Sequence, residues 1–101
     1  MGRRAAKVDA NQGEIVAALR AVGASVAPAH TMGGGFPDLV VGHQGVTYLL
    51  EVKTPKGKLT PDQERWHPEW RGHLAVVRSA EEALAAIGVE VVCVTIREVA
   101  G

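Results

Sequence analysis

Hydrophobic residues recur at helical spacing near the start of the chain and form short continuous runs further along it. Over residues 11–22, Ile15 and Leu19 belong to an apolar stripe with a period of three to four residues, which predicts a helix. Asn11 is a suitable N-cap for this helix, and Gly23 is a suitable stop. The chain is therefore expected to begin with one amphipathic helix.

Short runs rich in valine, isoleucine and leucine predict the strands. The runs at 39–41 and 46–52 flank a glycine-bearing segment at 42–45, which is typical of a β-hairpin. Three successive glycines at 33–35 precede the first of these runs and predict a loop. The predicted strands cover residues 25–29, 39–41, 46–52, 73–77 and 89–96.

Two further helices are indicated by capping signals. Thr60 begins a Thr-Pro-Asp-Gln sequence, with threonine as the N-cap, proline at the first helical position and glutamine at the third. This helix is expected to bend or end near His67, because Pro68 disfavours the helical conformation of the residue before it. Ser79 begins a second capping box, which opens the short helix predicted over residues 81–87.

The predicted order is helix, three strands, helix, strand, helix, strand, which places the chain in the α/β class. Helical connections after the third and fourth strands indicate a mixed sheet flanked by helices. A length of 101 residues fits one domain, which we expect to span residues 8–101 after a flexible basic N-terminus at 1–7.

Composition excludes several classes of protein. Eleven Lys and Arg balance eleven Asp and Glu, which argues against a strongly basic DNA-coating protein. The one cysteine, Cys93, cannot form an internal disulfide, and no apolar run is long enough to cross a membrane. No apolar segment follows the basic N-terminus, so a secretory signal is not predicted. We therefore expect a cytoplasmic protein with no membrane partner.

Charged residues mark one end of the predicted hairpin. Alternation along residues 46–52 places Glu51 on the same face as Leu49, and Lys53 continues that face just beyond. Asp38 opens the preceding strand, with twelve residues between it and Glu51. A hairpin of this length brings the start of one strand beside the end of the next. Asp38, Glu51 and Lys53 are therefore expected to converge at one end of the sheet.

Two carboxylates held side by side repel each other, and a divalent cation relieves this repulsion. Carboxylate oxygens favour Mg²⁺ or Mn²⁺, which share phosphate oxygens with a substrate. Such a cation activates water and stabilises negative charge on phosphorus, while an adjacent lysine stabilises the transition state. Asp38, Glu51 and Lys53 therefore favour hydrolysis of phosphodiester bonds, with the cation between the two carboxylates.

The sequence resembles the PD-(D/E)XK nuclease superfamily through Pro37-Asp38, the spacing of twelve residues and Glu51-Val52-Lys53. Further similarity, over residues 14–87, indicates the virus-type replication-repair nuclease (VRR-NUC) family within that superfamily. The additional matching features are Glu14 in the leading helix and the segments Gly-Phe-Pro-Asp-Leu-Val-Val at 35–41, Gly-Lys-Leu-Thr-Pro-Asp-Gln at 57–63 and Gly-His-Leu-Ala-Val-Val-Arg-Ser at 72–79.

The resemblance implies a restriction-endonuclease-like αβββαβ core that cleaves DNA with Mg²⁺ or Mn²⁺. It makes Asp38 and Glu51 metal ligands and Lys53 the catalytic lysine, and it places Gln63 close to the active site. Stand-alone phage members of the family imply a homodimer that acts on branched DNA, including four-way junctions. For a phage-encoded protein, the implied compartment is the cytoplasm of the bacterial host.

Two further residues are expected to support the metal. Glu14 corresponds to the glutamate of the family's leading helix, and the backbone carbonyl of Val52 is the expected ligand from the strand. Glu14 has an alternative interpretation as the third residue of a cap that begins at Asn11. Gln63 has the same ambiguity, because it forms a capping box with Thr60.

Local basic patches are candidate contacts for phosphate groups. They comprise Lys56 and Lys58, which follow Lys53, and Arg3 and Arg4 at the N-terminus. A solvated basic turn and a flexible terminus are the alternative interpretation. At the level of function, the alternative to a nuclease is a catalytically silent nucleic-acid-binding module of the same fold.

Histidine and tryptophan give weaker indications. The four histidines have no spacing that defines a zinc site. Trp66 and Trp70, four residues apart, predict a hydrophobic contact with the sheet or with a partner subunit, and stacking on DNA is the alternative.

Overall fold

A four-stranded sheet forms the centre of the protein in a computed structural model that describes residues 10–89. Its strands are β1 Ser25–Pro28, β2 Leu39–His43, β3 Val46–Val52 and β4 Leu74–Val77, and they lie in that order across the sheet. The first three strands pair antiparallel, whereas β4 joins β3 in parallel. The predicted α/β class with a mixed sheet is confirmed.

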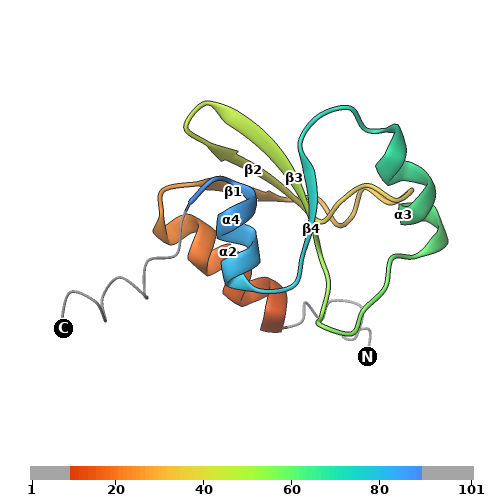
Figure 1. The fold of residues 1–101 in the computed structure, drawn as a ribbon, viewed down its shortest axis with the longest axis horizontal. Coiled ribbons are helices and arrows are strands. Elements are labelled where there is room, and N and C mark those ends of the chain that lie inside the picture. Colours follow the sequence, from red (N-terminus) through yellow and green to blue (C-terminus); the bar gives the residue numbers. More distant parts are fainter. Residues whose placement is uncertain (1–9, 90–101) are drawn as a thin grey trace.

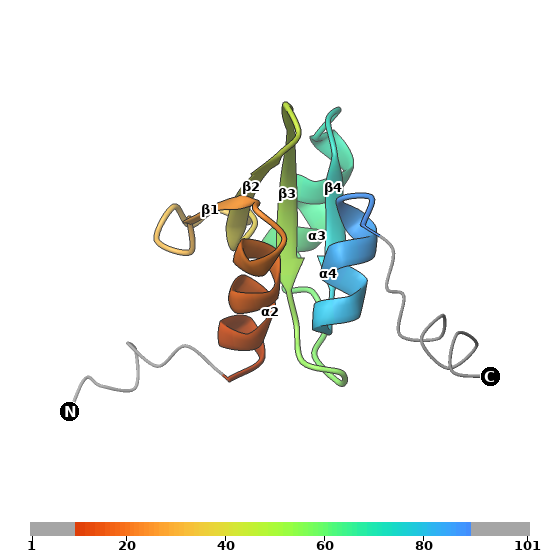
Figure 2. The same ribbon diagram turned by 90° about the vertical axis from the view of Figure 1, so that its left-hand side faces the viewer.

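Helices cover both faces of this sheet (Figures 1 and 2). Helices α2, Ala10–Ala21, and α4, Ala80–Ala86, lie side by side on one face, and α3, Pro61–Trp66, lies on the other. A single 3-10 turn, η1, His67–Glu69, follows α3. The element order therefore contains the expected αβββαβ core, with α4 added after β4. No helix within the described residues is long and apolar enough to span a membrane.

The hydrophobic core lies between the sheet and the helices α2 and α4. Ile15 and Leu19 are fully buried there, as the apolar stripe predicted. Leu50 and Val52 of β3 belong to the same core. Glu51 lies between them in sequence and therefore points to the opposite face, toward α3. Alternation along β3 thus separates the core from the charged face.

The β2–β3 hairpin closes with a two-residue turn. Gln44 and Gly45 both have positive φ, 51° and 82°, as a type I′ turn requires. β2 extends to His43, which pairs with Val46, so the turn is shorter than the predicted segment at 42–45. This tight turn determines the register of the whole hairpin.

The predicted capping signals are present at the starts of α3 and α4. Thr60 Oγ1 accepts the Gln63 N–H at 3.2 Å, and Gln63 Oε1 accepts the Thr60 N–H at 2.8 Å. α3 gives way to η1 at His67, where Pro68 predicted a bend or an end. Ser79 caps α4 through the hydrogen bond that its side chain accepts.

The predicted N-cap at Asn11 is wrong. Helix α2 already includes Ala10, so Asn11 lies in the first helical turn. Its side-chain Nδ2 instead donates a hydrogen bond to the backbone carbonyl of Lys53 at 2.7 Å. Asn11 therefore ties the helix to the end of β3.

Two predictions fall outside the described residues. One is the strand at 89–96, of which only Val89 is described, and it is not in a strand. The other is the basic N-terminus at 1–7, which contains Arg3 and Arg4.

Candidate active site

The open end of the β2–β3 hairpin brings Asp38 and Glu51 together. Leu39 pairs with Leu50, so the residue before β2 lies beside the next residue of β3. Asp38 Oδ2 accepts a hydrogen bond from the backbone N–H of Val52 at 2.9 Å, which holds this carboxylate against the strand. The structure therefore places the two carboxylates singled out in the sequence at one end of the sheet.

Glu51 is buried, with 1% of its surface exposed, and both of its oxygens have partners. Gln63 Nε2 donates to Oε2 at 3.1 Å, and His67 Nε2 lies 3.3 Å from Oε1. The Thr60 N–H donates a hydrogen bond to the amide oxygen of Gln63. This hydrogen bond directs the amide nitrogen of Gln63 toward Glu51. Gln63 therefore caps α3, as predicted, and also contacts Glu51, whereas its part in catalysis stays a prediction.

His67 belongs to this site, although the sequence interpretation considered the histidines only as zinc ligands. It follows Gln63 by four residues, and it is the C-cap residue of α3. Residues four apart share one side of a helix, so both side chains reach Glu51. That spacing is the signal in the sequence that identifies His67.

The titrating groups of the site are strongly perturbed. The pKa of the Glu51 carboxyl is raised from 4.5 to about 8, mainly by burial. The neighbouring carboxyl of Asp38 contributes to this rise, and the positive charge of Lys53 offsets part of it. The pKa of His67 is lowered, first by burial and then by Lys53. Both shifts favour the uncharged forms of these groups, a protonated Glu51 carboxyl and a neutral His67 imidazole.

The oxygen atoms at this end of the sheet fit a hard divalent cation. Part of the rise in the Glu51 pKa comes from the neighbouring carboxyl of Asp38, and a positive charge between the two groups would relieve that part. Carboxylate oxygens are the ligands that Mg²⁺ and Mn²⁺ prefer. The N–H of Val52 faces Asp38, and the carbonyl of a strand residue points to the same side as its N–H. That carbonyl is therefore available as a third oxygen ligand.

Glu14 lies apart from this pair. Its side chain is exposed on α2, and Asn11, three residues earlier, donates a hydrogen bond to the end of β3. Among residues 10–89, no three His, Cys, Asp or Glu side chains are grouped so that they could hold a metal ion. The arrangement thus gathers Asp38 with Glu51 but does not bring Glu14 to them.

Basic residues follow the end of β3. Lys53 is half-buried, and Lys56 and Lys58 are exposed in the connection to α3. Arg78 Nη1 donates to the carbonyls at both ends of the turn 54–57, at 2.7 Å each. This hydrogen bonding fixes the turn that carries Lys56. Arg78 is a further cation near the strand end that the sequence interpretation did not single out.

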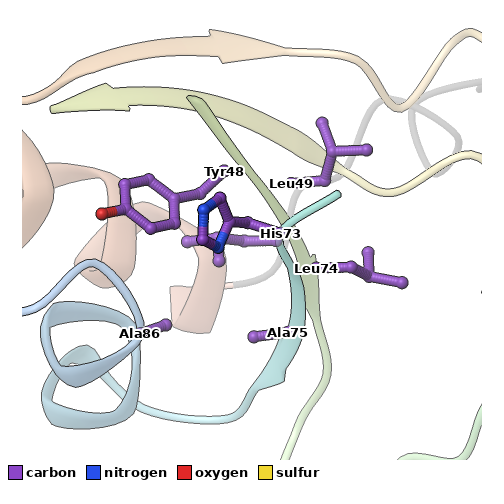
Figure 3. A pocket seen from close by; sticks show the side chains of 7 residues that line it. Tyr48, Leu49, His73, Leu74, Ala75 and Ala86 are labelled. Atoms are coloured by element: carbon purple, nitrogen blue, oxygen red, sulfur yellow. The ribbon is translucent and has the colours of Figure 1, made fainter. Parts of the chain in front are cut away.

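A separate hollow of about 80 Å³ lies at the amino ends of β3 and β4 (Figure 3). Tyr48 and His73 line it with ring centroids 4.9 Å apart, and Ala86 of α4 also borders it. Ligand pockets usually have volumes of about 300–1,000 Å³. The hollow is smaller than that and contains none of the candidate site residues.

Aromatic contacts hold α3 against the loop that leads to Asp38. Trp66 meets Phe36 edge to face with ring centroids 5.2 Å apart, and it stacks on Trp70 at 5.3 Å. The two tryptophans were predicted to contact the sheet or a partner subunit, but the ring contacts observed join Trp66 to Trp70 and to Phe36. This cluster fixes the helix that carries Gln63.

Gly35→Ala is expected to destabilise the protein more than Gly34→Ala. Both glycines have positive φ, 93° and 66°, so alanine costs about 1–2 kcal/mol of backbone strain at either position. A Cβ at Gly35 would also lie 2.5 Å from the carbonyl oxygen of Asp62 in α3, whereas one at Gly34 meets nothing within 4 Å. We expect a loss of about 3 kcal/mol or more for Gly35→Ala in urea unfolding. Equal losses would show that the close approach of loop and helix is not needed.

Comparisons with known proteins agree with this fold. The family model of the VRR-NUC domain matches residues 4–87, which is most of the chain. A solved structure described as a "VRR_NUC domain" is 29% identical, with a TM-score of 0.60, over 75% of this chain and 88% of that chain. No curated protein matches the sequence. The chain belongs to the VRR-NUC family and has its nuclease-type fold.

Proposed function

We propose that the protein is a divalent-metal-dependent nuclease that hydrolyses phosphodiester bonds in DNA. The observation that carries this proposal is the buried carboxyl group of Glu51 beside that of Asp38. Lys53 follows on the same strand, and membership of a nuclease family supports the same activity. In this proposal Asp38, Glu51 and the carbonyl of Val52 hold Mg²⁺ or Mn²⁺, and Glu14 is left out of the ligand set because it is not grouped with the two carboxyl groups.

Each residue has a defined part in the proposed reaction. The cation, when bound, supplies an activated water and a positive charge beside the scissile phosphate. Asp38 and Glu51 bind it, and the Val52 N–H keeps Asp38 at the strand end. Lys53 provides a fixed ammonium that stabilises negative charge developing on the phosphate. Gln63 holds one oxygen of Glu51 and thereby restricts rotation of that carboxylate.

We further propose that the substrate is branched DNA, such as a four-way junction, and that the active form is a homodimer. A two-fold dimer presents two active sites to the two strands that a junction requires to be cut. Lys56 and Lys58 beside the site, with Arg3 and Arg4, are the proposed phosphate contacts, which position the substrate without reading its sequence. Light scattering at micromolar concentration distinguishes the dimer from a monomer.

The proposal is tested with labelled four-way junction, flap, duplex and single-stranded DNA, each with Mg²⁺, Mn²⁺ or EDTA. We expect cleavage only with metal, fastest on the branched substrates. Asp38→Asn keeps the size of the side chain but removes a charged ligand, and it should lower the rate by at least about 100-fold. Glu64→Gln removes an exposed carboxylate from α3 and should leave the rate unchanged.

Cleavage that persists in EDTA, or that Asp38→Asn does not affect, would contradict the proposed mechanism. Binding of junction DNA without cleavage in either metal would favour the catalytically silent binding module. Equal rates on all four substrates would retain the nuclease and reject selectivity for branched DNA.

A further inference from the structure

Two side chains from the connection between β3 and β4 hold the two oxygens of Glu51 separately. Gln63 Nε2 is 3.1 Å from Oε2, and His67 Nε2 is 3.3 Å from Oε1. The side chain of His67 is 11% exposed and that of Glu51 is 1% exposed, so water competes little for this contact. Partners on both oxygens together define the plane of the carboxylate.

His67 restricts the plane of the Glu51 carboxylate, which Gln63 alone does not. The terminal torsion of a glutamate is broad, so rotamer preference does not fix the carboxylate plane. With Gln63 alone, Glu51 could still turn about its one hydrogen-bonded oxygen. An ionised carboxylate only accepts hydrogen bonds, so Nε2 of His67 must carry the hydrogen and donate it when Glu51 is ionised.

We propose that His67 is a positioning residue whose Nε2–H fixes the carboxylate of Glu51, so that the remaining lone pairs face the cation shared with Asp38. The inference rests on the metal site of the proposed function, and it adds a residue that acts through Glu51. Removing hydrogen-bond partners of metal ligands typically lowers metal affinity or activity 10–100-fold. His67 also meets the ring of Trp66 edge to face, with ring centroids 6.4 Å apart, so the test must separate this packing contact from the hydrogen bond.

The test compares two substitutions at the same position. His67→Phe keeps a flat ring without a donor, whereas His67→Gln offers a side-chain Nε2–H in place of the histidine Nε2–H. Titration calorimetry on the whole chain without DNA measures the affinity for Mn²⁺, and cleavage assays measure the Mn²⁺ concentration at half-maximal rate. We expect His67→Phe to lower the affinity for Mn²⁺ by about 10–100-fold and to raise the Mn²⁺ concentration at half-maximal rate by a similar factor. His67→Gln should recover most of this loss. His43→Phe, at the turn of the hairpin, should change neither.

Circular dichroism and thermal unfolding establish that each variant is folded, and His67→Ala replaces His67→Phe if the larger ring is not accommodated. An unchanged Mn²⁺ affinity in a folded variant without the donor would overturn the inference. Equal losses in His67→Gln and His67→Phe would also overturn it, because shape rather than hydrogen bonding would then matter. A wild-type protein that binds no Mn²⁺ would reject it together with the metal site. A wild-type protein that binds Mn²⁺ but cleaves no DNA would refute the nuclease alone, and the measured affinities would still decide the role of His67.

Discussion

Replacing Lys53 with methionine is expected to lower the rate of DNA cleavage at saturating Mg²⁺ by about 100- to 1,000-fold. Methionine keeps most of the aliphatic stem of this half-buried side chain and removes its ammonium group. In the proposed mechanism, the ammonium of Lys53 at the end of β3 stabilises the charge that develops on the phosphate in the transition state. We therefore expect the loss in the rate of cleavage rather than in the affinity for DNA.

The ammonium of Lys53 also acts on its two titrating neighbours. It lowers the pKa of both Glu51 and His67, so its removal should raise both and move the pH–rate profile to higher pH. Single-turnover cleavage over a range of pH measures the rate and this displacement together. Arg71→Met removes an exposed positive charge that has no part in the proposed site and is the control for loss of one cation. A Lys53→Met rate within a few-fold of the wild-type rate would exclude Lys53 from the mechanism.

Glu51→Gln is expected to stabilise the metal-free protein at neutral and alkaline pH. The pKa of Glu51 is about 8 in the folded protein, above its ordinary value of 4.5. The folded state therefore binds this proton more tightly than the unfolded chain does. The wild-type contribution is most favourable below pH 4.5 and is lost as the pH rises through 8. Each pKa unit corresponds to about 1.4 kcal/mol. The difference in the free energy of unfolding between Glu51→Gln and wild type should therefore be larger by several kcal/mol above pH 8 than below pH 4.5.

Urea unfolding in EDTA, at pH values below, within and above this range, measures the difference in the free energy of unfolding. Mg²⁺ added at the upper pH should restore the stability of the wild-type protein and leave Glu51→Gln unaffected, because the cation stabilises the folded state that binds it. Glu64→Gln, an exposed carboxyl on α3, should follow the wild-type curve. A constant difference between Glu51→Gln and wild type at every pH would show that burial does not perturb Glu51 as described.

The hairpin and the helix starts could be predicted because their signals are local. Runs of β-branched residues on either side of a glycine turn define β2 and β3, and Thr60 and Ser79 form their capping contacts within three residues. Asn11 misled the prediction for the opposite reason. Its amide bonds the carbonyl of Lys53, 42 residues away, and no local pattern indicates so distant a partner.

The features of the candidate site likewise divide into those that local pairing predicts and those that depend on distant contacts. Antiparallel pairing across twelve residues brings Asp38 beside Glu51, so this meeting follows from the sequence. The burial of Glu51 does not follow from the sequence, because glutamate is ordinarily exposed. Glu51 is covered by α3, which is distant along the chain. His67 was missed because helical spacing from Gln63 is hard to assume across the end of α3, where Pro68 follows.

Parallel pairing of β3 with β4 requires residues 53–73 to cross back over the sheet. This crossing segment carries both donors to Glu51, whereas Asp38 reaches Glu51 through one tight hairpin. Closing the longer connection costs more chain entropy than closing the hairpin, although this cost grows slowly with length. The meeting of the two carboxyl groups therefore depends on a local contact, whereas the orientation of Glu51 depends on a long-range one.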